Sequence, residues 1–187
     1  MKFERIIDGK DHLWAVRDMS KDVNELTELF RKWNNIEGLF DFFYANRKDL
    51  SDFFHIKSIR TAIDDTLEDA SELEALILDM PYTENLDDIF RPLGTLDMAM
   101  SELTREKARN WYRTHHASWL RVYAIRLEPN VYIITGGAIK LTRKMEDRPH
   151  TQIELDKLNR CRQYLADNGV FDKDSFTGLM EENEYEI

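Results

Sequence analysis

The chain has 187 residues, of which 42% are hydrophobic and 11% aromatic, enough apolar material for the core of one domain. Its formal net charge is −10, it has one cysteine, and its most apolar run, residues 131–141, is far shorter than a bilayer-spanning helix. This composition argues against a disulfide framework, a cysteine-rich zinc site and a membrane span, and it predicts a soluble cytoplasmic protein.

Charge is distributed unevenly along the chain. Residues 61–104 hold twelve acidic residues and one basic residue, whereas residues 105–163 hold thirteen basic and six acidic residues. A basic block indicates a phosphate-bearing partner, and an acidic block repels one. Two alternatives follow: the basic block binds an external anion, or the two blocks neutralise each other in the folded chain.

The first half of the chain predicts a hairpin followed by helices. Two short strands flank the Asp8-Gly9 turn, and residues 22–33 show a capping-box spacing and a helical apolar stripe. Residues 35–54 are apolar at helical spacing, and residues 58–80 predict a long helix with one acidic face. A short helix near residues 84–90 and a helical or irregular stretch up to Arg113 complete this half.

The second half predicts a hairpin and a closing helix. The side chains of residues 119–127 and of residues 131–141 alternate as they do in strands, and the Pro129-Asn130 turn separates the two ranges. Residues 151–168 then form a helix that ends at Asn168-Gly169. Strands near both ends of the chain, with helices between them, indicate an α+β fold, in which a small antiparallel curved sheet carries helices on one face next to a mainly helical acidic segment.

We expect a single domain over residues 1–187. Its parts are core strands and a closing helix within residues 1–33 and 112–168, an acidic helical insertion over residues 35–104, and an acidic C-terminal tail over residues 175–187.

Strand alternation separates the side chains of the second hairpin into two faces. Leu120, Val122 and Ala124 form an apolar face that we expect to pack on helices, whereas Trp119, Arg121, Tyr123 and Ile125 form a face that we expect to be open to a ligand. Cations that bind phosphate beside rings that stack on bases are typical of RNA binding. The alternative is a solvated face whose charges pair with acids of the same chain. Gly136-Gly137 indicates a bulge or a close backbone approach.

The segment WLRVYAIRLEPNVYIITGGAIKLTRKMEDRPHTQIELDKL has an Arg-bearing strand, a tight turn, an apolar strand ending in IKLTRK, and a helix. In this order of elements, about residues 112–168 resemble the RelE/ParE superfamily, the toxins of bacterial toxin–antitoxin pairs, including the HigB branch and a related phage branch. The ribonucleases of that family use Arg, Lys, Tyr or His side chains on the sheet to cut mRNA in the ribosomal A site.

The resemblance implies specific roles for residues of the basic block. It assigns catalysis to Arg121, Tyr123, Arg126, Lys140 and Arg143, and substrate binding to Trp119, Lys144, His116 and Arg113. The implied reaction is attack of a ribose 2′-OH on its neighbouring phosphate, which needs a base, a cation and an acid but no metal or cofactor. The implied partners are an antitoxin protein and RNA on the ribosome, with no membrane.

Two features leave an alternative open. The family's toxins are compact and basic, whereas this chain carries the acidic segment, and family members that lost activity or act on DNA gyrase share the fold. The alternative function is a non-catalytic interaction module, or an inactive toxin homologue, whose basic face binds RNA or an acidic protein. A metal site is not expected, because adjacent His115 and His116 point apart and the usual zinc spacing is absent.

Overall fold

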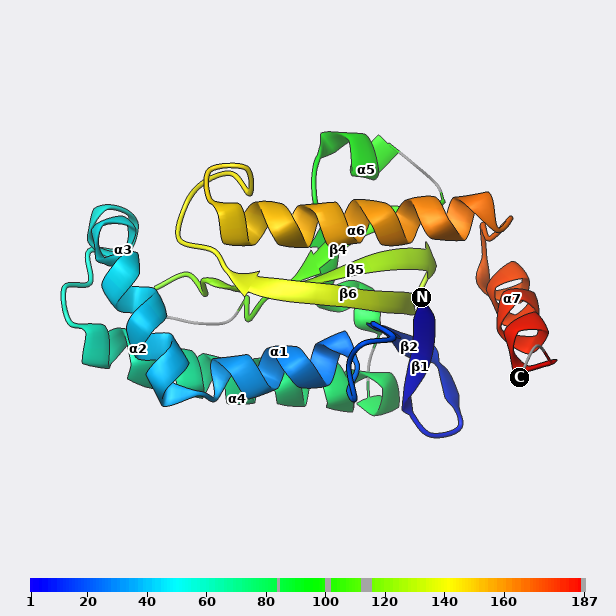
Figure 1. Cartoon of the computed structure of the whole chain (residues 1–187), viewed down its shortest axis with the longest axis horizontal. Coiled ribbons are helices and arrows are strands. Elements are labelled where there is room, and N and C mark those ends of the chain that lie inside the picture. Colours follow the sequence, from blue (N-terminus) through cyan, green and yellow to red (C-terminus); the bar gives the residue numbers. More distant parts are fainter. Residues whose placement is uncertain (84, 100–101, 112–115, 186–187) are drawn as a thin grey trace.

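The computed structural model describes residues 1–83, 85–99, 102–111 and 116–185 (Figure 1). The elements are β1 (Lys2–Ile7), β2 (Lys10–Arg17), α1 (Glu25–Trp33), α2 (Ile36–Ala45), α3 (Arg47–Phe54), α4 (Ile59–Thr83), the short 3-10 helix η1 (Leu86–Asp88), β3 (Phe90–Pro92), α5 (Thr95–Ala99), β4 (Thr104–Ala108), β5 (Leu120–Glu128), β6 (Val131–Ile139), α6 (Pro149–Asp167) and α7 (Lys173–Tyr185). In this part of the chain no helix is long and apolar enough to cross a membrane.

One curved sheet organises the chain, in the strand order β1-β2-β6-β5-β4-β3. The α+β class is confirmed, and so are both hairpins: β1 pairs with β2 around Gly9, and β5 pairs with β6 around Asn130, both with positive φ. The sheet is mixed rather than purely antiparallel, because β2 and β6 run parallel. The stretch between residues 90 and 108, which we expected to be helical or irregular, contributes the edge strand β3 and its neighbour β4, which pairs with β5.

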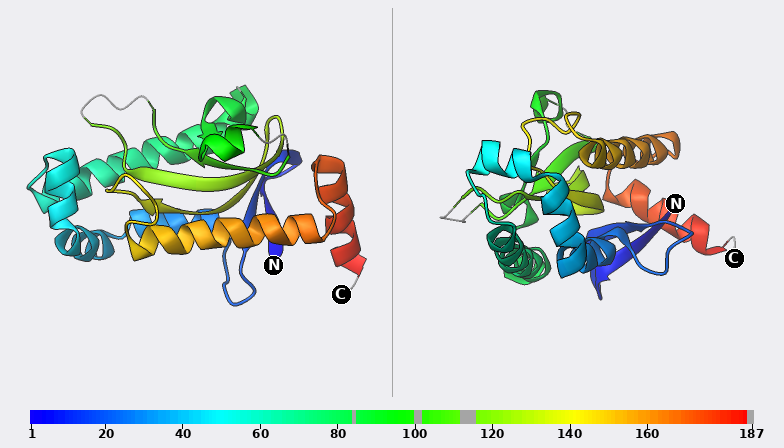
Figure 2. Two further views of the ribbon diagram at one scale, coloured as in Figure 1. Left: turned by 90° about the horizontal axis from the view of Figure 1, so that it is seen from above. Right: turned by 60° about the vertical axis from the view of Figure 1, so that its left-hand side comes forward.

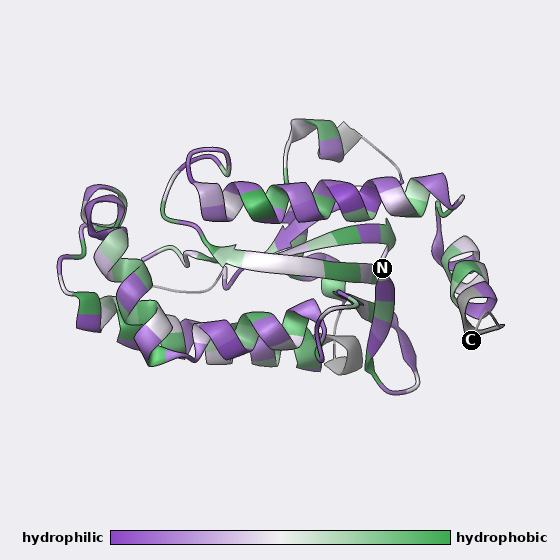
Figure 3. Cartoon of the chain, viewed as in Figure 1, coloured by the Kyte–Doolittle hydropathy of each residue, from purple (hydrophilic) through white to green (hydrophobic). Residues whose placement is uncertain are grey.

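Helices cover both faces of the sheet, where the sequence analysis expected one covered face (Figure 2). On the face that we call the α4 face, the helices α1 to α4 pack on the sheet; on the opposite face, the α6 face, α6 and α7 do so. Hydrophobic and hydrophilic residues alternate along α1 and α6 (Figure 3), as expected for helices with one side packed on the sheet. The second face is covered because β5 and β6 also present apolar side chains there, among them Ile125, Leu127 and Ile133.

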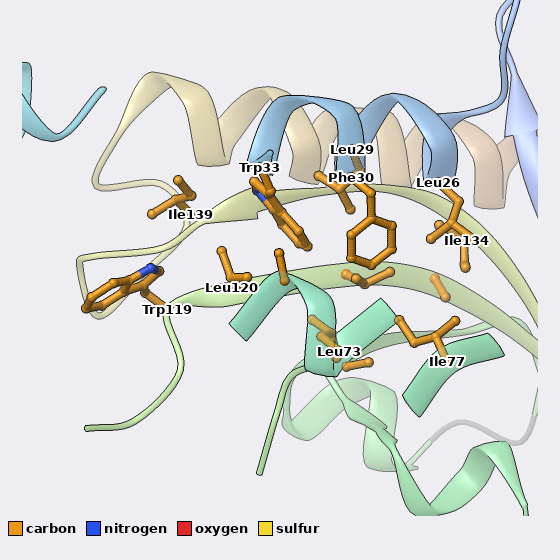
Figure 4. Packing of buried hydrophobic residues seen from close by; sticks show 14 of the residues in the cluster. Leu26, Leu29, Phe30, Trp33, Leu73, Ile77, Trp119, Leu120, Ile134 and Ile139 are labelled. Atoms are coloured by element: carbon orange, nitrogen blue, oxygen red, sulfur yellow. The ribbon is translucent and has the colours of Figure 1, made fainter. Parts of the chain in front are cut away.

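The acidic segment belongs to the main core. Leu73 and Ile77 of α4 share one cluster with Leu29 and Phe30 of α1 and with Ile134 of β6 (Figure 4). Most acids of α4 lie on its exposed outer side, whereas Asp69 is buried and accepts from Ser118. The apolar stripe of the helix is part of the core. The predicted C-terminal tail likewise contains α7, whose buried residues Phe176 and Leu179 pack on the α6 face.

Gly136 and Gly137 act both as a bulge and as a point of close approach. The β5–β6 register shifts between Tyr123 and Ala124, and Gly136 has a φ of 149°. A Cβ atom at Gly137 would lie 2.5 Å from Leu29 Cδ2 of α1 and 2.4 Å from the Arg121 carbonyl oxygen, so only glycine fits there. The bulge lets α1 lie close to the sheet and leaves the Gly137 N–H free to donate to Glu154 of α6 at 3.1 Å.

Candidate anion-binding site

A pocket of about 650 Å³ opens on the α6 face of the sheet. Its walls come from β4, β5, the segment before α5, α5 itself, the loop between β6 and α6, and α6. Both α5 and α6 lie on the same side of the sheet (Figures 1 and 2). The lining residues are Leu93, Gly94, Thr95, Asp97, Arg105, Lys107, Arg121, Tyr123, Lys140, Arg143, Lys144, Met145, Glu146 and Leu155. Six of these are cations and two are acids.

Strand register explains why the basic residues meet. Lys107 of β4 lies opposite Tyr123 of β5, and Arg121 lies two positions before Tyr123, so all three side chains point to one face. Lys140 follows β6, where its backbone N–H donates to the Trp119 carbonyl at 2.8 Å and keeps it beside the start of β5. The pocket therefore sits where three strands bring cations to one end of one face.

Lys107, Arg121 and Lys140 have neutral acceptors instead of carboxylates. The Lys107 ammonium donates to the carbonyls of Pro92 and Leu93, at 3.1 and 3.3 Å. The Arg121 guanidinium donates to two carbonyls at 2.6 Å, and the Lys140 ammonium donates to the Thr142 carbonyl at 2.7 Å. Within the described ranges these three cations form no ion pair. Their charges are therefore available to an anion.

The acids of the pocket do not compensate these cations. Asp97, which is 2% exposed, is held by Arg105 through two hydrogen bonds of 3.0 Å, so this pair neutralises itself. Glu146 lies exposed at the rim beside Arg143 and Lys144, which are exposed too. The pocket thus has an uncompensated basic interior and a mainly basic rim.

Burial and mutual repulsion lower the pKa values of these cations. The pKa of Lys107 falls because of burial and then of Arg121 and Arg109, and the pKa of Lys140 falls because of burial and then of Arg121 and Lys107. Burial, followed by Arg109, lowers the pKa of Arg121 to about 10. For all three cations burial contributes more to the lowered pKa than the neighbouring positive charges do.

Tyr123 adds an unpaired donor to the pocket. Its side chain is fully buried, and its hydroxyl has no hydrogen-bond partner among the described residues. Burial raises its pKa, so the hydroxyl stays protonated and can donate. Buried hydroxyls nearly always have a partner in folded proteins, so this hydroxyl is able to donate to an acceptor that binds beside the three cations.

The pocket brings together five of the nine residues that the resemblance singled out, and it separates the others. Arg121, Tyr123, Lys140, Arg143 and Lys144 line it. Arg126 is five positions after Arg121 in the same strand, so its side chain points to the α4 face. There its guanidinium pairs with Asp87 at 3.3 Å, and the Tyr132 hydroxyl donates to Asp87 at 2.5 Å.

Trp119 and His116 also lie on the α4 face. Trp119 precedes β5, so the alternation that placed it with Arg121 does not apply; it is fully buried and donates to Thr66 Oγ1 at 3.0 Å. The expected open face with Trp119 and Tyr123 is therefore wrong, because both side chains are buried, on opposite faces. His116 stacks on Trp119 at 4.2 Å and lies 3.1 Å from Asp65. Arg113 falls outside the described residues.

Sequence reasoning missed Lys107, Arg105 and Asp97 as pocket residues. The signal was available in the alternation of Thr104, Glu106 and Ala108 with Arg105 and Lys107, which is typical of a short strand with one buried face. This alternation was not recognised because Glu106 and Arg105 are adjacent charged residues, which obscure the pattern of a strand.

The pocket is not arranged as a metal site. Among the described residues no three His, Cys, Asp or Glu side chains come together in a way that could hold a metal ion. Its chemistry is that of an anion site with one neutral donor. Comparisons of the chain with protein-family models, with curated proteins and with solved structures gave no match.

Proposed function

We propose that the basic pocket binds the phosphate backbone of RNA. The observation that carries this proposal is the convergence of Lys107, Arg121 and Lys140 without a carboxylate partner among the described residues. Three partly buried positive charges repel one another, and a bound phosphate relieves that repulsion while accepting charge-assisted hydrogen bonds. The Tyr123 hydroxyl supplies a neutral donor to the same phosphate.

Features of the rim favour a polymer over a free anion. Arg143 and Lys144 are exposed at the edge of the pocket and extend its positive charge outward, as a chain of phosphates requires. Leu93, Met145 and Leu155 add apolar surface beside the cations, on which a ribose or a base edge can pack. The resemblance of residues 112–168 to the RelE/ParE toxins supports RNA as the polymer.

Binding of a labelled single-stranded RNA, followed by fluorescence anisotropy, tests this proposal. The double variant Arg121→Ala/Lys140→Ala should bind at least about tenfold more weakly, since each phosphate contact contributes over a kcal/mol. Arg126→Ala is the control, because it removes one positive charge from β5, the strand of Arg121, on the other face. A wild-type protein without affinity for RNA at about 0.1 M salt would refute the proposal.

A metal-independent endoribonuclease is the second candidate function, and the lowered lysine pKa values favour it. The minor, deprotonated form of Lys107 or Lys140 takes the proton of a ribose 2′-OH as its oxygen bonds to the adjacent phosphorus. Arg121 stabilises the negative charge that develops on the phosphorane oxygens. The bond from phosphorus to the 5′ oxygen then breaks, an acid protonates that oxygen, and the products are a 2′,3′-cyclic phosphate and a 5′-OH end.

Cleavage and binding are separated by two measurements. Growth arrest on expression, together with cuts in mRNA on ribosomes, would support the toxin-type activity, and a 2′-deoxy nucleotide at the cut site should abolish the cut. Binding of RNA without cleavage would favour the non-catalytic interaction module over the endoribonuclease. Preference for polyglutamate over RNA would instead favour an acidic protein as the partner of the pocket.

A further inference from the structure

Helix α2 has more apolar side chains than its packing buries. Leu39 and Phe43 point into the core, at 2% and 0% exposure. On the opposite side, Ile36, Phe40 and Tyr44 are 60%, 49% and 56% exposed. These three lie at successive intervals of four residues, so they form one stripe along the outer side of the helix. We call them the α2 stripe.

The stripe is prearranged and accessible. The rings of Phe40 and Tyr44 stack, with centroids 6.1 Å apart and an interplanar angle of 15°. α2 and α3 lie at the end of the molecule away from α7, and hydrophobic patches appear on α2 (Figures 1 and 3). Contiguous exposed aromatic side chains of this kind usually mark a contact with another molecule.

The charges at the two ends of the stripe have opposite signs. Glu37 borders Ile36 at the N-terminal end, and it is exposed. Arg47 borders Tyr44 at the C-terminal end, where its guanidinium lies 5.0 Å from the ring centroid and donates to the Tyr44 carbonyl at 2.9 Å. Neither charge has an opposite-charge partner in the described ranges. A surface that is acidic at one end and basic at the other is complementary to itself when turned by 180°.

We propose that the α2 stripe is a symmetric contact between two copies of this chain. In an antiparallel pair of α2 helices, a two-fold axis midway between Phe40 and Tyr44 places Phe40 opposite Tyr44 of the second copy. The same axis places Glu37 opposite Arg47 of the second copy, and the symmetry makes this pair twice. Four aromatic rings then form the centre of the contact, with an ion pair at each end. The pocket lies on the α6 face, so the contact is independent of the proposed RNA binding.

Sedimentation velocity of the full chain at about 0.15 M salt, where the repulsion between two acidic chains is screened, tests this proposal. The wild type should form a dimer whose fraction rises with concentration. Phe40→Ser should raise the dissociation constant at least about tenfold, the effect of removing a central aromatic anchor. Phe171→Ser is the matched control, because Phe171 is exposed to a similar degree, 54%, and lies outside the stripe; it should leave the dimer unchanged.

A charge reversal identifies the orientation of the pair. Glu37→Arg and Arg47→Glu should each weaken the dimer about threefold to tenfold, since one substitution removes two symmetric ion pairs. The combined variant should return the affinity to near the wild-type value. Circular dichroism confirms that each variant is folded. The proposal would be overturned if the wild type were monomeric at all concentrations or if Phe40→Ser did not weaken the dimer. It would also be overturned if the combined charge-reversal variant formed a weaker dimer than both single variants.

Discussion

The two faces of the sheet carry similar charged residues, but these residues differ in whether they have a partner of opposite charge. On the α4 face, Arg126 pairs with Asp87 and His116 lies against Asp65. Ser118 donates to Asp69 of α4 at 2.6 Å. On the α6 face, Lys107, Arg121 and Lys140 converge on one pocket and reach only carbonyl oxygens among the described residues.

Cations that are paired support the fold, whereas cations that are not paired can bind an anion. Arg121 and Arg126 belong to one strand, and only their faces differ. A cation with a carboxylate partner contributes to the fold, and its loss leaves a carboxylate unpaired. A cation that is partly buried among other cations destabilises the fold until an anion binds. Substitutions that break a pair on the α4 face should therefore lower stability, whereas substitutions in the pocket should lower affinity.

The largest expected effect is that of Trp119→Ala on the α4 face. The side chain is fully buried between Phe43 and Phe54 and donates to Thr66. Its removal should lower the free energy of unfolding by about 3–5 kcal/mol, measured by urea denaturation. A loss under about 1 kcal/mol would mean that Trp119 is not a core residue and would reopen a role in ligand binding.

Asp87→Ala should have the next largest effect. Asp87 accepts hydrogen bonds from the Tyr132 hydroxyl and from the Asn130 N–H in the β5–β6 turn, and it pairs with Arg126. Losing these contacts should lower the free energy of unfolding by about 2–3 kcal/mol. The affinity of the folded variant for RNA should not change. A weaker RNA affinity at unchanged stability would place the ligand on the α4 face.

Lys107→Met should have a smaller effect, of opposite sign, on stability. The folded-state pKa of Lys107 lies below its ordinary value of 10.5, so the charged form is disfavoured by folding. Its destabilising effect is complete at neutral pH and disappears as the pH rises through the folded-state pKa toward 10.5. Removing the charge should raise the free energy of unfolding at pH 7 by at most about 1 kcal/mol, after allowance for solvent screening. Lys57→Met, at an exposed position, is the control and should be neutral.

The stability difference between Glu106→Gln and the wild type should depend on pH. Burial raises the pKa of Glu106, which is 3% exposed and accepts a hydrogen bond from Thr104. The stability that this carboxyl contributes is present below its unfolded value, near 4.5, and is lost as the pH rises through the folded-state pKa. The variant should therefore be more stable than the wild type at pH 7, and this advantage should shrink below pH 4.5. Equal stability differences at both pH values would contradict this assignment.

The hairpin and the closing helix were predictable because their local signals agree with their tertiary roles. Runs of β-branched, aliphatic and aromatic residues on either side of the Pro129-Asn130 turn define β5 and β6, and Asn168-Gly169 ends α6. β4 was missed because its buried face contains Glu106, a charged residue in a position that normally takes an apolar one. Because β4 was missed, Lys107, which lies directly opposite Tyr123, was not recognised as a pocket residue.

The covering of the second face also escaped prediction. Periodicity shows that Tyr123 and Ile125 share a face, but it does not show whether a helix covers that face. Likewise, a count of charges places an acidic block beside a basic one without showing which acids reach which cations. In the structure Asp65 and Asp69 of α4 meet the segment before β5, on the face opposite the pocket. Pairing depends on the side of the sheet, which sequence distance does not record.

The dependence of RNA affinity on salt tests the central claim most directly. Each phosphate that a cation contacts releases counterions and adds about 0.7 to the slope of log affinity against log salt for single strands. Lys107→Met/Lys140→Met should therefore lower that slope by about 1.4, whereas Arg126→Met, which removes a paired cation, should leave it unchanged. Equal slopes for the wild type and the double variant, or a lower slope for Arg126→Met alone, would contradict the account.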